Sequence, residues 1–421
     1  MPCMIELEVL IMKRNTYIAF IWHGIFLALT LSMLDLNTVF PALIDEMTHS
    51  KVIFGFLYAM MLGIPLIFNI IFSHYLKSYK RKKKFLLFGI YLRSFAFLGM
   101  AAFTYLFSVS RPTFTTVTFF FWVFLFSISA GFAGISYSDI IGKTLNSQER
   151  ISLYTVKQFL SSIMALLGGL IIKGIFSQPG LTYPRNYSIS LFIGGIGLAI
   201  ASLGFFLLKE PDSILSDEPQ ISLRHYLRSV PSVIKKDLNF KKFIIVENMA
   251  SFSIMIMPFY IIFAKSAFNI GNDYIGTYLI FQVSGTILSN FIWGFIAKKY
   301  NSKGVVTNCI FIGAMLPLLA VALSFTNADL YGIVFVLIGF IISGRRIGFE
   351  PLLLDIAPEN KRTEYLGIRG TLNIFIVILP ILGGFFIESV GYYITFPIVS
   401  MVMLLAYYLL NHGKHSDKLI K

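Results

Sequence analysis

The sequence predicts an all-α integral membrane protein with twelve transmembrane helices, arranged as two pseudo-symmetric bundles of six. Three observations lead to this prediction. The chain of 421 residues is 56% hydrophobic and only 13% charged, with a mean hydropathy of +0.76, which is too little charge to cover a soluble domain of this size. Its apolar runs are about 20 residues long, the length that a helix needs to cross a bilayer. One long polar segment divides these runs into six and six.

The expected spans follow the apolar runs along the chain. These runs are continuous, unlike the alternating strands of roughly 10 residues that form outer-membrane barrels, so each is expected to be a helix. The polar segment 209–240 is the longest connection and separates an N-terminal bundle, 1–208, from a C-terminal bundle, 241–421. The twelve spans are expected at 17–42, 53–76, 85–108, 114–142, 154–176, 187–208, 240–264, 273–297, 304–325, 330–354, 366–388 and 391–411.

Basic residues indicate which ends of the spans face the cytoplasm. Six lysines and arginines lie between Lys77 and Lys84, more lie at 298–303 and in the segment 209–240, and the opposite loops hold only five. By the positive-inside rule, both termini and the long segment are cytoplasmic, as in a multi-pass protein of the inner (cytoplasmic) membrane. The formal net charge of +14 is thereby explained by basic residues that fix the orientation of the spans in the membrane. A specific role of the basic run in binding anionic lipid or nucleic acid is the alternative, and we expect no nucleic-acid partner.

Motifs of catalysis and metal binding are missing from the sequence. The two cysteines, Cys3 and Cys309, give neither a disulfide framework nor the spacing of metal ligands. The sequence has no HExxH motif, no phosphate-binding GxxxxGK[ST] loop and no nucleophile elbow. We therefore expect no enzyme activity, no catalytic residues, no cofactor, no metal and no ATP-driven pumping.

The two halves of the chain repeat each other in sequence. Segment 69–82 matches segment 290–303 at an offset of 221 residues, where an asparagine, two lysines and a tyrosine coincide. At an offset of 212 residues, each half has an arginine followed seven residues later by a second basic residue, Arg150 with Lys157 and Arg362 with Arg369. Several matches in the same order favour two homologous halves over chance similarity between apolar segments.

Two parallel six-helix halves joined by a long cytoplasmic segment are the layout of many secondary transporters. The chain resembles the major facilitator superfamily over essentially its whole length. That family carries the signature G-x-L-x-D-R-x-G-R-K between spans two and three, often echoed between spans eight and nine. Here the two copies read SHYLKSYKRK, at 73–82, and GFIAKKYNSK, at 294–303. Both place a lysine, Lys77 and Lys298, where the family has aspartate, so the gating ion pair of that aspartate is not carried over.

Other residues are assigned by the same resemblance. The repeated basic pairs are similar to the basic loops that follow spans four and ten of the family. The resemblance therefore implies gating roles in cytoplasmic loops for Lys77, Arg81, Lys298, Arg150, Lys157, Arg362 and Arg369. The stretch LDLNTVFPALI, at 34–44, and the spans after it resemble an uncharacterised, mostly bacterial branch of the family, which implies no particular substrate.

Ionisable residues within the spans are candidates for function, because burying each of them in a bilayer costs several kcal/mol. Arg345 lies ten residues before Asp355 in span ten, or about 15 Å along the helix. Arg346 and Glu350 are four residues apart and share a helix face, whereas Arg345 points about 100° away. We expect Arg346 to pair with Glu350 or with Glu247 of span seven, and Arg345 to be the freer arginine.

The resemblance implies that spans one, four, seven and ten line a central cavity. The candidates for the translocation path are therefore the polar residues of these spans, Asp35, Asn37, Tyr137, Glu247, Asn248, Arg345, Arg346 and Glu350. Three carboxylates among them are candidates for proton coupling, Asp35, Glu247 and Glu350. Alternatively, span ten holds a satisfied ion network and Asp35 lies at a wet outer mouth. Arg93 and Asp139 are expected to form a structural ion pair.

These features predict a secondary active transporter that moves a small solute across the membrane by alternating access. We expect it to use a proton or another coupling ion, to contact membrane lipids and to act as a monomer. The two arginines of span ten favour an anionic or carboxylate-bearing solute. A proton-coupled multidrug efflux pump for cationic amphipaths is an alternative, in which Asp35 and Glu247 contact the substrate. A transport-dead receptor or scaffold, binding a partner through its long cytoplasmic segment, is another.

Overall fold

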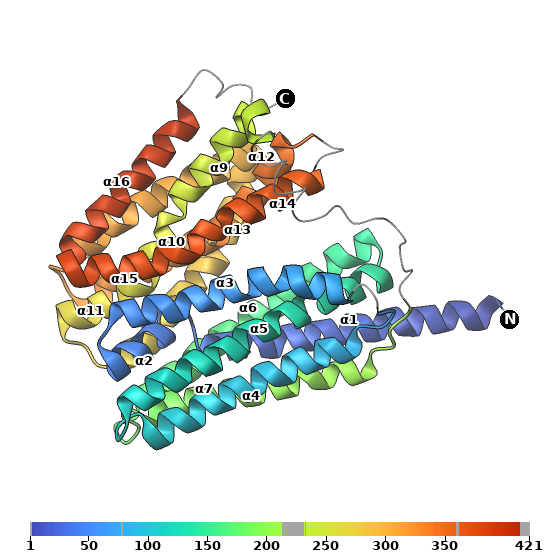
Figure 1. The fold of residues 1–421 in the computed structure, drawn as a ribbon, viewed down its shortest axis with the longest axis horizontal. Helices are drawn as coiled ribbons and strands as arrows, with labels where there is room; N and C mark the ends of the chain where they lie inside the picture. Colours follow the sequence, from blue (N-terminus) through green and yellow to red (C-terminus); the bar gives the residue numbers. More distant parts are fainter. Residues whose placement is uncertain (1, 77–78, 213–230, 232, 359–361, 413–421) are drawn as a thin grey trace. The chain divides into compact units, whose positions relative to one another are not determined.

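The structure is a computed structural model, and it describes residues 2–76, 79–212, 231, 233–358 and 362–412 of the chain. Within these residues all regular secondary structure is helical (Figure 1). Eleven helical stretches in this described part are long and apolar enough to cross a membrane, and the longest of them, Asp273–Leu323, contains two of the expected spans. The all-α membrane fold that the sequence predicts is confirmed.

The chain divides into two compact units. Unit 1 comprises Met1–His49, Leu57–Ser216 and Asn272–Leu279, and unit 2 comprises Ser50–Phe56, Asp217–Gly271 and Ile280–Lys421. The main boundary lies within the segment 209–240, which the sequence predicts to join the two halves. The short segments 50–56 and 272–279 depart from a simple division into halves.

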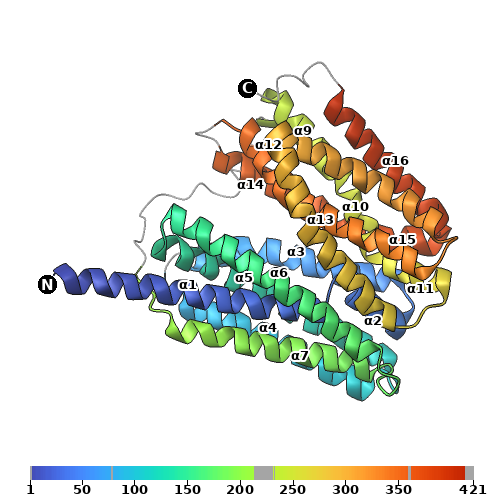
Figure 2. The same ribbon diagram turned by 180° about the vertical axis from the view of Figure 1, so that it is seen from behind.

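Unit 1 consists mainly of long helices that pack side by side. Its helix α4 packs against α5 and α7, and α1 packs against α6 and α7, as both views show (Figures 1 and 2). Buried Phe20, Ile90, Ile140, Leu153 and Phe205 belong to one apolar cluster of this unit. The elements are α1 (Pro2–Met33), α2 (Val39–Thr48), α3 (Lys51–Leu76, whose first residues belong to unit 2), α4 (Lys83–Phe107), α5 (Pro112–Thr144), α6 (Ser147–Phe176), α7 (Arg185–Leu203) and η1 (Gly204–Leu207).

Unit 2 is built from longer helices and several short helical pieces. Its α9 packs against α13 and α16, and α10 packs against α15 and α16. Phe240, Phe349, Leu353, Tyr365 and Ile368 belong to its buried apolar cluster. The elements are α9 (Leu238–Ala250), α10 (Phe252–Ile256), η2 (Met257–Phe259), α11 (Tyr260–Phe268), α12 (Asp273–Leu323, whose first turns belong to unit 1), α13 (Ala328–Ile356), α14 (Arg362–Leu372), η4 (Asn373–Ile378), α15 (Leu379–Val390) and α16 (Tyr392–Asn411).

The expected first span, 17–42, is not one continuous helix. Helix α1 ends at Met33 and α2 begins at Val39. Between them the Asp35 carboxylate accepts hydrogen bonds from the Asn37 backbone N–H at 3.0 Å and the Thr38 hydroxyl at 2.9 Å. A short polar side chain that binds the nearby backbone competes with the helix for the same groups. The prediction of an unbroken span one is therefore wrong at Asp35.

Span seven is also interrupted. Helix α9 ends at Ala250, α10 begins at Phe252, and the 3₁₀ turn η2 surrounds Pro258 before α11 begins at Tyr260. Proline has no backbone N–H and cannot continue an α-helical ladder, which explains the second interruption. The first interruption, at Ser251, has no such residue. It lies beside the charged cluster described below.

Spans eight and nine both lie within α12, which consists of two helices joined at a kink, as the sequence predicts for two separate spans. Asn301 marks the kink between them, with a backbone φ of 57° and ψ of −170°. Asparagine tolerates a positive φ better than most residues other than glycine, but the combination with an extended ψ is one that glycine alone adopts readily. This residue lies in the loop 298–303 that was expected between the two spans.

Candidate functional site

A group of charged residues connects α9, α13 and α14 within unit 2. Arg369 of α14 donates three hydrogen bonds to the Glu247 carboxylate of α9, from Nε at 2.9 and 3.0 Å and from Nη2 at 2.6 Å. Its Nη1 atom lies 3.9 Å from Oε2 of Glu350 in α13. A forked guanidinium suits a carboxylate that accepts two parallel hydrogen bonds, which are among the strongest in proteins. Arg369 therefore bridges two carboxylates that the sequence assigned to different spans.

The two carboxylates differ sharply in their surroundings. The Glu247 side chain is 2% exposed, whereas that of Glu350 is 63% exposed. A buried carboxylate is stable only beside a counter-charge, so Glu247 depends on Arg369. Glu350 lies close to the distance limit of an ion pair and faces open space. Its loss would leave Arg369 paired with Glu247.

Arg345 forms hydrogen bonds at the first interruption of span seven. Its Nη1 atom donates to the Ala250 carbonyl at 3.1 Å and its Nη2 atom donates to the Ser251 hydroxyl at 2.8 Å. The guanidinium lies 5.0 Å from the centre of the Phe349 ring, one turn further along α13. The last carbonyls of a helix have no partner within it, and a cation is favourable there. Arg345 thus caps the C-terminal end of α9.

The expected roles of the two neighbouring arginines are exchanged. Arg346, expected to pair with Glu350 or Glu247, is exposed and forms no ion pair within the described residues. Arg345, expected to be the freer of the two, is anchored to Ala250 and Ser251. The four-residue spacing correctly predicted that Arg346 and Glu350 are both exposed on α13. It did not predict their partners, because the cation beside Glu247 and Glu350 is Arg369.

Asn248 lies next to the charged group. Its side-chain N–H₂ donates to the Ile244 carbonyl at 2.9 Å and lies 3.5 Å from the side-chain oxygen of Asn373 in η4. The Ser251 hydroxyl donates to the Glu247 carbonyl at 2.7 Å. Since Arg345 donates to that same hydroxyl, a chain of hydrogen bonds links the end of α9 to α13.

Arg369 is the residue whose partners sequence reasoning missed. The family resemblance implied a gating role in a cytoplasmic loop, although the expected span 366–388 already contains this residue, and it lies in α14, within a stretch, Tyr365–Val390, that is long and apolar enough to cross a membrane. The repeat contained a signal for it, because the offset of 212 residues equates Arg369 with Lys157. Lys157 is likewise helical, in the stretch Gln148–Phe176.

Lys157 makes a comparable bridge within unit 1. Its ammonium group donates to the Tyr137 hydroxyl of α5 at 2.9 Å and lies 4.9 Å from the centre of the Tyr154 ring. Its carbon stem crosses Gly24 of α1, where a Cβ atom would meet the Lys157 Cγ at 2.5 Å. Lys157 therefore joins α6 to α5 and α1, as Arg369 joins α14 to α13 and α9.

The remaining path candidates lie at the break in span one. Asp35 is engaged by Asn37 and Thr38, as described above. The side-chain oxygen of Asn37 is buried and has no hydrogen-bond partner within the described part of the chain. A buried unpaired carbonyl is costly, so this atom is available to a donor. The break belongs to unit 1, and the charged group around Glu247 belongs to unit 2.

The loop candidates have varied positions. Lys77 lies outside the described residues, as does the side chain of Arg362. Arg81 pairs with Asp212 at 2.6 Å, and both side chains are exposed. Arg150 lies in the first turn of α6, and Lys298 is exposed within α12.

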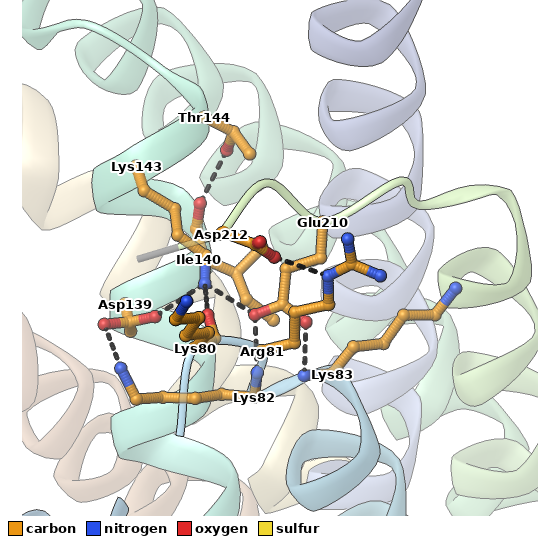
Figure 3. Close-up of polar contacts among 10 residues, drawn as sticks. All are labelled: Lys80, Arg81, Lys82, Lys83, Asp139, Ile140, Lys143, Thr144, Glu210 and Asp212. Carbon is orange, nitrogen blue, oxygen red and sulfur yellow. Dashed lines mark hydrogen bonds and ion pairs between the residues drawn. The ribbon is translucent and has the colours of Figure 1, made fainter. Parts of the chain in front are cut away.

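The expected ion pair of Arg93 with Asp139 is wrong. Asp139 is held by Lys82 at 2.5 Å and by Lys143 at 3.0 Å (Figure 3). Lys143 also donates to Glu210 at 2.6 Å. Lys82, from the basic run, precedes α4, and Lys143 lies one turn after Asp139 on α5, so the carboxylate pairs with these two lysines and not with Arg93.

Arg93 is instead enclosed by α5. Its Nε donates to the Ser129 hydroxyl at 3.2 Å, and its guanidinium lies 5.1 Å from the centre of the Phe126 ring. A cation over an aromatic face is stabilised without a carboxylate. The structural role expected for Arg93 thus comes from these contacts with α5.

The whole chain is similar to known transporters. The sequence profile of the Major Facilitator Superfamily matches residues 24–344 and 243–419. The structure of the nucleoside transporter NupG shares 14% sequence identity and a TM-score of 0.65, over 96% of this chain and 99% of that one. A D-xylose-proton symporter shares 15% sequence identity and a TM-score of 0.62, over 97% of this chain and 99% of that one. The peptide transporter POT in complex with sulfate shares 8% sequence identity and a TM-score of 0.68, over 97% of this chain and 96% of that one. No curated protein matches the sequence.

Proposed function

Because the chain belongs to the Major Facilitator Superfamily, we propose that it is a secondary active transporter for a small anionic or carboxylate-bearing solute, coupled to protons and located in the cytoplasmic membrane. The similar structures include transporters for a nucleoside, a sugar and peptides. At identities of 8 to 15% they support the fold and leave the solute to be argued from the residues of this chain.

The observation that carries the proposal is the exposed guanidinium of Arg346. It lies ten residues before the end of α13 at Ile356, or about 15 Å along the helix. An arginine at such a depth in contact with lipid tails would cost several kcal/mol. Glu350 is exposed on the same helix, and the face that carries both charges is therefore proposed to line a water-filled path. Arg346 then offers an anion a partner that no carboxylate of the described residues occupies.

The same face suits a solute that carries both a carboxylate and an amine. Arg346 can bind the carboxylate through its forked guanidinium, and Glu350, one turn away, can bind the amine. A solute with only an anionic group would contact Arg346 alone. The proposal thus covers organic acids and amino-acid-like or peptide-like solutes, and the contribution of Glu350 to binding separates the two classes.

Proton coupling is proposed to act through Glu350. Its exposed carboxylate lies 3.9 Å from Nη1 of Arg369, which also binds Glu247. When Glu350 is protonated, Arg369 therefore keeps Glu247 as its counter-charge. Coupling requires that solute and proton favour the same conformational change. A proton that reduces the negative charge beside Arg346 strengthens the attraction for an anion, which links the two binding events.

The experiment is a ligand screen on purified protein, followed by uptake into proteoliposomes. A bound solute raises the melting temperature by mass action. We expect carboxylate-bearing solutes to stabilise the wild type, and R346Q to lose that stabilisation and the uptake. The matched control is K235Q, which removes an exposed cation before α9 and should retain both. Stabilisation by cationic amphipaths that survives in R346Q would point to efflux, and the proposal would be wrong.

A further inference from the structure

A second candidate site lies in unit 1, where α3 ends and α4 begins. A cavity of about 1460 Å³ opens there, lined by residues of α3, α4 and α5 and by the segment that follows η1. None of its lining residues belongs to the break in span one or to the charged group around Glu247. By the positive-inside rule, this end of the unit faces the cytoplasm.

One wall of this cavity is aromatic. Tyr75 and Tyr79 are joined by a hydrogen bond of 2.8 Å between their hydroxyls, and the Tyr79 ring meets the Phe85 ring edge-on at 4.8 Å. Phe88 meets Phe132 of α5 edge-on at 5.8 Å. The Tyr75 and Phe88 side chains are about half exposed. Rings of this kind gather at the level of lipid headgroups, where one end is apolar and the other is wet.

The rim of the cavity is basic. Five cationic side chains line it against two carboxylates, and the cations are Lys80, Arg81, Lys83, Lys84 and Lys209. Lys83 donates to the Leu208 carbonyl at 2.7 Å. Within the described part of the chain, neither Lys80 nor Lys84 forms an ion pair.

The two carboxylates of the rim are already engaged by the protein. Glu210 accepts from the backbone N–H groups of Lys82 at 2.6 Å and Lys83 at 2.7 Å, and from Lys143 (Figure 3). Asp212 accepts from Arg81 at 2.6 Å, and this guanidinium holds the pKa of the Asp212 carboxyl below its usual value. These hydrogen bonds and ion pairs offset most of the negative charge of the two carboxylates, so the positive charge of Lys80 and Lys84 is not cancelled at the rim.

We propose that this cavity binds an anionic phospholipid of the cytoplasmic leaflet. The headgroup phosphate contacts Lys80 and Lys84, and an acyl chain lies along the aromatic wall. The cavity matches a lipid because it combines an apolar wall with a cationic rim, whereas a soluble anion would use the rim alone. Each basic residue near an anionic headgroup contributes a free energy that corresponds to about a fivefold gain in affinity.

The test measures lipid bound to the purified full-length protein by native mass spectrometry. Phosphatidylglycerol is compared with phosphatidylcholine of the same acyl chains, in mixed micelles. We expect the wild type to prefer phosphatidylglycerol, and K80Q/K84Q to lose about fivefold in affinity for each lysine replaced. The control variant K235Q/K236Q removes two exposed lysines from unit 2 and should keep the preference.

A reciprocal variant guards against loss of folding. D212N releases Arg81 from an exposed ion pair, which costs little stability, and should strengthen phosphatidylglycerol binding. Equal binding of the two lipids by the wild type would overturn the proposal, and so would an equal loss in K235Q/K236Q. Displacement of the lipid by inorganic phosphate would show a site for a free anion, which also overturns it.

Discussion

Arg369 and Glu247 form a buried ion pair in unit 2, with three hydrogen bonds of 2.6 to 3.0 Å between residues 122 positions apart. The pair ties α14 to α9 at the point where α9 approaches its end. The Glu247 side chain is 2% exposed and that of Arg369 is 19% exposed. Removing either partner therefore leaves a charge with little access to water.

The first prediction is a strong coupling between these two residues. R369Q leaves the Glu247 carboxylate buried without its cation and should destabilise the protein by about 3–5 kcal/mol. E247Q/R369Q removes both charges and should recover much of that loss. The measurement is a double-mutant cycle on melting temperature in detergent. Additive effects of the two single variants would show that the pair contributes no specific energy.

The second prediction concerns Arg345 as the cap of α9. R345Q should lower stability by about 1.5–3 kcal/mol, the range for hydrogen bonds to a charged group. R345K should rescue poorly, because one ammonium group cannot contact the Ala250 carbonyl and the Ser251 hydroxyl while lying over Phe349. Thermal unfolding with and without solute checks this. If R345Q weakens solute binding at unchanged stability, then Arg345 contacts the solute and the capping role is wrong.

The helices were predictable because the bilayer imposes the same length and apolarity on each of them. The interruptions were not. Asp35 lies in a run as apolar as its neighbours, and only its local bonds to Asn37 and Thr38 show that the helix ends there. The kink at Asn301, by contrast, lies between the expected spans 273–297 and 304–325, and the sequence left open only its backbone geometry.

The site was predictable in its residue types and less so in its pairs. Helix periodicity placed Arg346 and Glu350 on one face, because that relation is local to α13. Periodicity could not show that Arg369, from a helix later in the chain, is the residue that pairs with Glu247. The repeat equated Arg369 with Lys157 and so marked its position, but a repeat carries no information about partners. Contacts between distant helices depend on packing that a single sequence does not display.

The third prediction fixes the orientation of the chain in the membrane. The sequence has two cysteines, and Cys309 is buried at 2% exposed, so C3S gives a background with little reactive thiol. We expect a cysteine introduced by G180C to react with an impermeant reagent on intact cells. One introduced by K236C should react only after permeabilisation. The reverse pattern would place the termini outside and contradict the positive-inside assignment.

The last prediction separates the roles of Arg346 and Glu350 on the exposed face of α13. R346Q should remove solute binding at every pH, because it removes the cation that attracts the anionic group. E350Q carries no titrating group and should abolish accumulation driven by a pH gradient while solute exchange continues. For a solute that carries an amine, E350Q should also weaken binding, and for a simple organic acid it should not. Both variants should melt within a few degrees of the wild type, since neither residue is buried. Uptake with and without a pH gradient, and counterflow with solute on both sides of the membrane, are the measurements. Unchanged gradient-driven uptake in E350Q would exclude Glu350 from coupling and direct the search to Asp35 at the break in span one.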